Sequence, residues 1–186
     1  MKDYITNVLM GTLRENIESL IEYMDDTGFF YMPCSGAHHL AKEGGLAEHT
    51  GNVIKLADEL AKMWLEPMGM YDILRPSVHI AAALHDLGKT GQFDKPGYVP
   101  NILKSGEQSE SKPYKQNPKL LNVPHEIRSV AIAQMFIDLT EEEQFAILNH
   151  NGLYTALGKM TLPGNETMLQ MILHFADMWA SRVVER

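Results

Sequence analysis

Residues 76–89 read PSVHIAAALHDLGK, and the rest of the predicted fold can be built outward from this stretch. Its apolar, alanine-rich centre predicts a buried helix over residues 76–87, with Gly88 just past its end. Two polar side chains, His85 and Asp86, close this helix without an evident structural reason. Adjacent residues project about 100° apart on a helix, so the imidazole of His85 and the carboxylate of Asp86 can reach neighbouring positions in space. We therefore expect a functional site at this helix end.

Apolar residues at steps of three and four predict further helices on both sides of this stretch. These helices are expected over residues 3–26, 46–66, 124–139, from 140 to about 150, and 165 to about 179. Thr140 and Glu143 predict a capping box, and Asn165 is expected to cap the last helix. The sequence therefore predicts an all-α bundle of about six or seven helices, in one domain over residues 1–186.

The helical periodicity vanishes between Gly88 and Val123, where Gly, Pro, Ser and Lys accumulate. A purely structureless connection of this length is uncommon inside a compact domain. Residues 98–103 and 112–116 flank the polar segment SGEQSE and predict a short β-hairpin lying over the domain. We expect an insertion at about residues 91–122.

Charge and composition limit the classes of partner. Sixteen basic and 24 acidic residues give a formal net charge of −8, which argues against a broad basic surface for long nucleic acid. No apolar run reaches the ~18–20 residues that a membrane helix needs, and the N-terminal residues lack a signal-peptide pattern. We expect a cytoplasmic protein without a membrane partner, and the sequence leaves a homo-oligomer open.

The one cysteine, Cys34, excludes an internal disulfide and a cysteine-rich zinc cluster. We expect it to be a small buried or loop residue rather than a nucleophile, because no orienting group is evident beside it.

Histidine and aspartate near helix ends suggest a metal. A carboxylate such as that of Asp86 has two oxygens and can bridge two cations about 3.5–4 Å apart. In the last helix, His174 and Asp177 are three residues apart and share a face within the apolar run LHFADMW. A charged group there needs a partner to justify its burial, and a metal would be such a partner.

Five sequence runs carry a family resemblance: GGLAEHT at 44–50, LHDLGK at 84–89, HEIRS at 125–129, NHNG at 149–152 and HFAD at 174–177. In this order and spacing, within residues 38–180, they resemble the HD superfamily of metal-dependent phosphohydrolases. The chain looks most like the branch that includes a bacterial 3′-5′ exoribonuclease, because His38 and His39 precede the first run and an alanine-aspartate pair closes the last. The resemblance implies an HD-domain helical bundle.

The resemblance also implies a set of metal ligands. One metal would lie on His49, His85, Asp86 and Asp177, and a second on bridging Asp86 with His125 and His150. Such oxygen and imidazole ligands suit Mn, Fe, Co or Ni, and Zn less specifically, with Mg as a further candidate. The expected cofactor is one or two divalent metal ions.

Further residues are expected to contact the substrate. By resemblance, Lys89 and Arg128 would hold a phosphate, although Lys89 also suits the end of a helix as an ordinary cation. His38, His39 and Asn151 are the other expected substrate-binding residues. Asn151 stands where the exoribonuclease branch has a second histidine, and an amide binds metal more weakly than imidazole.

The resemblance predicts an enzyme that cleaves a phosphomonoester or phosphodiester with a metal-bound hydroxide, with Asp86 and Lys89 as catalytic residues. A small phosphorylated substrate is expected, such as a nucleotide or short oligonucleotide, and long RNA is not. Two features support a small substrate. They are the negative formal net charge, and the lack in this sequence of the oligonucleotide-binding domain usual in the exoribonuclease branch. The insertion at 91–122 could close over such a ligand.

Three alternatives stay open. A separate HD branch of mixed-valent di-iron oxygenases, which act on small polyols or phosphonates, shares the ligand order and the run HDLGK. A 3′-5′ exoribonuclease is the second alternative, and a metal-bearing regulatory or ligand-sensing module is the third. Oxygen consumption would favour the oxygenase, whereas phosphate release under argon would favour hydrolysis.

Overall fold

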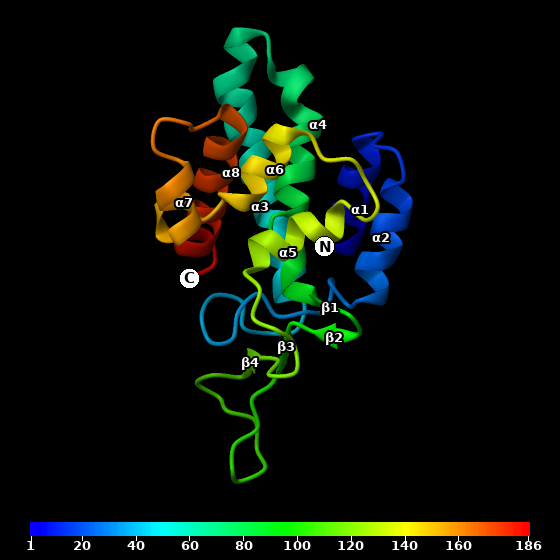
Figure 1. Ribbon diagram of the computed structural model, residues 1–186, viewed down its shortest axis with the longest axis vertical. Coiled ribbons are helices and arrows are strands. Elements are labelled where there is room, and N and C mark those ends of the chain that lie inside the picture. The colour runs from blue at the N-terminus through cyan, green and yellow to red at the C-terminus, as the bar shows by residue number, and fades with distance from the viewer.

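The computed structural model describes residues 1–186 and is mostly helical (Figure 1). Its α-helices are α1 (Lys2–Gly11), α2 (Ile17–Asp26), α3 (Gly45–Leu65), α4 (Tyr71–Leu84), α5 (His125–Ala133), α6 (Glu141–Leu148), α7 (Ala156–Thr161) and α8 (Met168–Trp179). Shorter helical turns are η1 (Glu66–Met68), η2 (Leu87–Thr90), η3 (Gly152–Tyr154) and the π-helical η4 (Ala180–Val184). This confirms a helical architecture, with eight α-helices in place of the six or seven expected.

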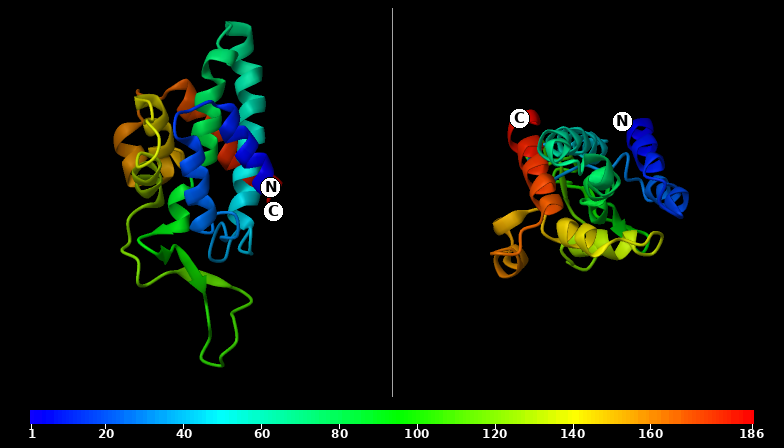
Figure 2. Two further views of the ribbon diagram at one scale, coloured as in Figure 1. Left: turned by 90° about the vertical axis from the view of Figure 1, so that its right-hand side faces the viewer. Right: turned by 90° about the horizontal axis from the view of Figure 1, so that it is seen from above.

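Helices α3 and α4 lie side by side at the centre of the molecule. Helix α8 packs against α3, α1 packs against both α3 and α4, and α6 packs against α4 and α8. Viewed from above, α1 and α2 flank the central pair on one side and α8 on the other (Figure 2). One continuous cluster of 33 buried apolar residues, from Ile5 in α1 to Ala180 in η4, fills the space between them.

The single helix expected over residues 3–26 is wrong, because the chain breaks between α1 and α2. Leu13 and Asn16 have φ of 54° and 59°, in the left-handed region that ends a helix. The side chain of Leu13 is 89% exposed, although its spacing continues the apolar stripe. The break places Arg14 at a bend, where it can reach another helix.

Arg14 ties this bend to the start of α6. Its guanidinium donates to both carboxylate oxygens of Glu143 at 2.5 and 3.1 Å, and to the carbonyl of Asp138 at 2.6 Å. The Glu143 carboxylate also accepts from the Thr140 N–H, and the Thr140 hydroxyl accepts from the Glu143 N–H. The predicted capping box is therefore confirmed, and its buried carboxylate also bonds the α1–α2 bend.

Other helix boundaries differ from the predicted ones. Helix α4 begins at Tyr71, with Pro76 inside it rather than in its first turn, and ends at Leu84 rather than residue 87. Helix α5 ends at Ala133 and not at residue 139, because the apolar spacing continues into a turn that buries Ile137 and Leu139 without being helical.

The last helix has a different cap from the expected one. The Thr167 side chain accepts from the Gln170 N–H at the start of α8. The expected cap, Asn165, instead donates from its amide to the carbonyl of Thr161.

Two antiparallel hairpins follow η2. Strands β1 (Gly91–Gln92) and β2 (Lys95–Pro96) form the first, and β3 (Tyr98–Pro100) and β4 (Tyr114–Gln116) form the second. The second lies within the expected hairpin of residues 98–103 and 112–116, whereas the first was not predicted. Figures 1 and 2 show the far end of the second hairpin, residues 101–113, projecting away from the helices rather than lying over them.

Gly88 joins the end of α4 to α5 by close backbone approach. The Gly88 N–H donates to the Ser129 hydroxyl at 2.8 Å, and this hydroxyl donates to the carbonyl of His85 at 2.8 Å. A Cβ at residue 88 would lie only 2.2 Å from the carbonyl oxygen of His125. Any larger residue would therefore push apart the two segments that carry His85 and His125.

None of the helices combines the length and apolar character that a membrane crossing requires.

We predict that Glu143→Ala lowers the free energy of unfolding by about 2–4 kcal/mol, since it removes a helix cap and leaves Arg14 without its buried carboxylate partner. Glu141→Ala is the matched control, because this exposed glutamate lies in the same helical turn, and its effect should stay within about 0.5 kcal/mol. Urea denaturation measures both changes. Equal stability of the two variants would contradict a stabilising role for the bidentate Arg14–Glu143 pair.

Candidate metal centre

Six histidine and aspartate side chains from five segments converge at one end of the helical body. His49 lies in α3, His85 and Asp86 follow α4, His125 begins α5, His150 follows α6, and Asp177 lies in α8. All six are within 4 Å of at least one other member. The structure thus brings together every residue expected to bind metal.

Asp86 is at the centre of this cluster, and its side chain is only 2% exposed. Its Oδ2 lies 3.5 Å from His49 Nε2 and 3.4 Å from His85 Nε2. Its Oδ1 lies 3.1 Å from His125 Nε2 and 3.8 Å from His150 Nε2. The two carboxylate oxygens therefore face two different pairs of imidazoles.

Asp86 Oδ1 is a buried acceptor to which no N–H is aligned as a hydrogen-bond donor. Leaving a charged oxygen in this state is costly, unless a cation or an ordered solvent molecule satisfies it. His85, Asp86 and His150 each offer a ligand atom within 4.8 Å of the others. The orphaned oxygen and its imidazole neighbours fit a divalent cation.

A second group of ligand atoms comes from His49, His85 and Asp177, which also lie within 4.8 Å of one another. His49 Nε2 is 3.3 Å from His85 Nε2 and 3.2 Å from Asp177 Oδ1. Two imidazole nitrogens at this distance cannot both carry a proton, so a lone pair is available to a cation. His85 belongs to both groups, whereas the sequence-based hypothesis placed it in one only.

The remaining nitrogen of three histidines is held by the protein. His85 Nδ1–H donates to the carbonyl of Ala82 at 2.9 Å, and His150 Nδ1–H donates to that of Ile147 at 2.8 Å. His49 Nδ1–H donates to the Glu185 carboxylate at 3.0 Å. Such bonds select the tautomer whose Nε2 carries no proton, and Nε2 is the atom that faces the cluster.

Glu185 was not identified from the sequence. Its side chain is 1% exposed and accepts from His49 and from the Asn52 amide at 3.1 Å. It lies 136 residues from His49 along the chain, and no local pattern marks a glutamate at such a position.

The pKa shifts favour the metal-binding form of some members of the cluster and not of others. Burial lowers the pKa of His49, but the neighbouring Cys34, Asp177 and Glu185 hold it well above its usual value. Burial would raise the pKa of Asp86, but the Lys89 ammonium and His85 hold it well below its usual value. Burial and the nearby His85 lower the pKa of His150 to about 3, so this imidazole is neutral at physiological pH. An ionised carboxylate and a neutral imidazole are the states in which these groups bind a metal.

Lys89 supplies the cation closest to Asp86. Its Nζ lies 2.6 Å from Asp86 Oδ2 and 3.7 Å from Cys34 Sγ. The Asp86 carboxylate holds the pKa of Lys89 above its usual value despite burial, so the amine stays charged. A helix-end lysine directed at solvent is therefore not what the structure shows.

Of the other residues expected to contact the substrate, some lie beside the cluster and some do not. His39 lies at the edge of the cluster, with Nε2 3.8 Å from Glu185 Oε2, whereas His38 is exposed. Asn151 donates from its amide to His150 Nε2 at 2.9 Å and to Glu126 at 2.8 Å. His174 Nδ1–H donates to the carbonyl of His150 at 2.7 Å, which supports the chain behind the cluster.

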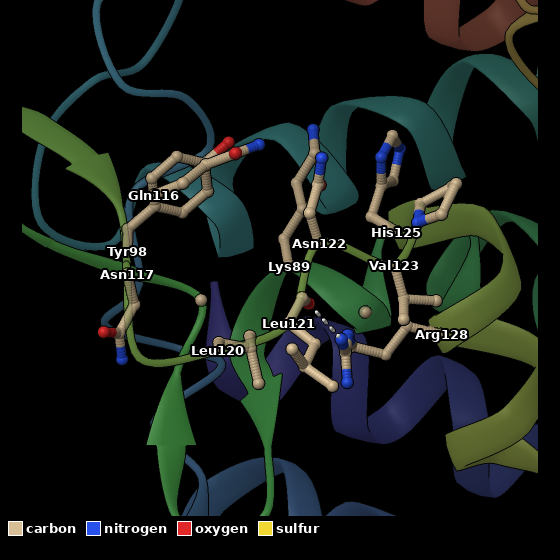
Figure 3. Close-up of a pocket in the computed structure, with 13 residues that line it drawn as sticks. Lys89, Tyr98, Gln116, Asn117, Leu120, Leu121, Asn122, Val123, His125 and Arg128 are labelled. Carbon is tan, nitrogen blue, oxygen red and sulfur yellow. Dashed lines mark hydrogen bonds between the residues drawn. The ribbon is translucent and has the colours of Figure 1, made fainter.

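A cavity of about 150 Å³ adjoins the cluster, and Lys89 and His125 line it. Figure 3 shows Tyr98 and Gln116 on one side of this cavity and His125 and Arg128 on the other. The Arg128 guanidinium donates to Gln92 Oε1 at 2.8 Å and to the carbonyl of Leu121 at 3.0 Å. Arg128 thus attaches the cavity wall to α5, and its role as a phosphate ligand stays a prediction.

Comparisons with protein families, curated proteins and solved structures found no match for this chain.

We predict that Asp86→Ala lowers the affinity for Mn²⁺ by more than about tenfold on both sides of this residue, since it removes the carboxylate that faces His49 and His85 with one oxygen and His125 and His150 with the other. Asp86→Asn should be milder, because it keeps the shape and one acceptor oxygen. Equilibrium dialysis with metal analysis measures the stoichiometry. His174→Ala is the control and should keep most of the metal, whereas full metal retention by Asp86→Ala would contradict a shared ligand.

Proposed function

We propose that this chain is a metal-dependent phosphohydrolase of the HD type that acts on a nucleotide-sized phosphoester. The observation that carries the proposal is the Asp86 carboxylate, whose two buried oxygens face separate imidazole pairs. A carboxylate whose two oxygens face separate sets of imidazoles suits two-metal phosphoester chemistry.

The residues available to two divalent ions divide around Asp86. His49, His85 and Asp177 would hold one ion, and His125 and His150 would hold the other. When bound, such ions lower the pKa of a water molecule and stabilise negative charge on phosphoryl oxygens. The Asn151 amide, 2.9 Å from His150 Nε2, would have to turn away from this nitrogen before the imidazole could bind metal.

Lys89 is suited to bind the phosphate. Its ammonium bonds Asp86, and the residue lines the cavity, so the amine can exchange one anionic partner for another without leaving the site. Such a shift replaces one charge-assisted hydrogen bond with another, and the charge remains neutralised throughout. His125, which is 31% exposed, is the cluster histidine most accessible from the cavity.

The cavity beyond Lys89 has the chemistry of a small polar ligand site. The Tyr98 ring offers a stacking face, and the side chains of Gln116, Asn117 and Asn122 offer amide donors and acceptors. A nucleoside attached to the bound phosphate could use both kinds of contact. The formal net charge of −8 adds no extended basic track for a longer polymer.

The test is a screen for hydrolysis of nucleotides and short oligonucleotides under argon, with Mn²⁺, Co²⁺, Fe²⁺ or Mg²⁺ supplied in turn. Released phosphate reports cleavage of a monoester, and chromatography of the nucleotide products reports cleavage of a diester. We expect turnover of at least one mononucleotide or short oligonucleotide, and loss of that turnover in Asp86→Asn. Oxygen consumption without phosphate release would instead identify an oxygenase. Degradation of a 20-mer RNA as fast as the best mononucleotide would contradict the substrate size.

We predict that Lys89→Ala raises KM for the phosphorylated substrate by about tenfold or more, because it removes a charge-assisted contact to phosphate. Metal content should not fall, since the change also removes a cation that competes for Asp86 Oδ2. Lys95→Ala, on the exposed strand β2, is the charge-matched control. Unchanged kinetic constants in Lys89→Ala would reduce this lysine to a structural partner of Asp86.

A further inference from the structure

An apolar groove of about 410 Å³ lies between α3 and α8 on the outside of the helical body. Seven of its eight lining residues are hydrophobic, and three of them are the aromatic residues Trp64, Phe175 and Trp179. The rings of Trp64 and Phe175 meet edge to face, with centroids 6.0 Å apart. None of the lining residues belongs to the Asp86 cluster, so the groove is a feature separate from the metal centre.

The side chains of this groove are open to solvent. Met63 is 59% exposed and Trp179 is 55% exposed, while Trp64 and Phe175 are each 39% exposed. Seen from above, the outer side of α3 lies between α1 and α8 with no other helix over it (Figure 2). Contiguous apolar surface of this kind marks contact with another molecule, and aromatic residues and methionine are enriched at the centre of protein interfaces.

Charges of alternating sign follow the edge of α3 beside the groove: Lys55, Glu59, Lys62 and Glu66. Steps of four, three and four residues place them on one side of the helix, and all four are exposed. None of them takes part in an ion pair within the chain. The Lys55 ammonium lies 5.3 Å from the centroid of the Tyr4 ring. These charges are therefore available to a partner.

The order of these four charges is complementary to its own reverse. If two copies of α3 pack antiparallel about a two-fold axis between residues 60 and 61, residue 59 faces residue 62 and residue 55 faces residue 66. Each facing pair is then one glutamate and one lysine, and the axis makes each pair occur twice. Moving the axis by two residues in either direction would bring Glu59 against Glu66 or Lys55 against Lys62. The charges thus favour one register of a second copy of the chain.

We propose that a second copy of this chain covers the groove, so that the α3–α8 face is the interface of a homodimer. A two-fold axis that relates antiparallel helices keeps the same edge of both on one side. The charged edges of the two α3 helices therefore meet on one side of the interface, and the α8 helices lie on the other. Helices α3 and α8 of both copies then form a four-helix arrangement with the apolar residues inside. The proposal does not depend on phosphohydrolase activity.

The test is analytical ultracentrifugation of the full chain, and we expect a species of twice the 21.0 kDa mass of one chain. Glu59→Lys brings a lysine against Lys62 of the second copy, and Lys62→Glu brings a glutamate against Glu59 of the second copy. Each variant alone should raise the Kd of the dimer by about tenfold or more. An equimolar mixture of the two variants has opposite charges at both positions and should dimerise as tightly as the unaltered protein. This rescue requires that residues 59 and 62 of two copies face each other.

Met63→Glu and Met160→Glu form a matched pair that tests the apolar part of the interface. Met63→Glu should dissociate the dimer, because it places a charge at the centre of the contact, whereas Met160→Glu, on the 76% exposed residue of α7, should leave it unchanged. A monomer at about 100 µM, where a dimer with a micromolar Kd is formed, would overturn the proposal, as would a mixture of the charge variants that stays monomeric. Cosedimentation of a monomer with phosphatidylcholine vesicles would instead assign this face to a lipid surface. Hydrolysis is assayed separately, so failure of one proposal does not imply failure of the other.

Discussion

Burial of one carboxylate is the constraint on which the rest of the site depends. Asp86 is almost fully enclosed, and a charged group in such a place must be neutralised and hydrogen-bonded. Lys89 satisfies one oxygen, while four imidazoles surround the pair of oxygens. The end of α4, the start of α5 and the residue after α6 meet here, where their imidazoles approach the same carboxylate.

The histidines that follow helices serve the fold and the site at once. A helix leaves its last carbonyls without intrahelical donors, and a side chain can satisfy them. His85 and His150 each donate Nδ1–H to a carbonyl three residues earlier, at the ends of α4 and α6. The same bond directs Nε2 toward Asp86, so no further interaction is needed to select the tautomer that binds metal.

The His49 ring stands between two environments. One nitrogen faces the Asp86 cluster, and the other donates to Glu185, which is also within reach of His39. Because Glu185 accepts from Nδ1–H, it helps to fix the orientation of the ring whose Nε2 faces Asp86. Glu185 follows η4, so the C-terminal segment orients one imidazole of the cluster.

The sequence by itself determined the helical class, the α6 capping box and the set of histidines and aspartates that meet, because each depends on local spacing or on motif order. The α1–α2 break escaped prediction, since Leu13 keeps the apolar spacing while the backbone turns toward Glu143. Glu185, and the inward turn of His39 but not His38, were decided only by the tertiary structure. Such contacts join segments far apart in the chain, and their geometry follows from how whole helices pack, which no local pattern encodes.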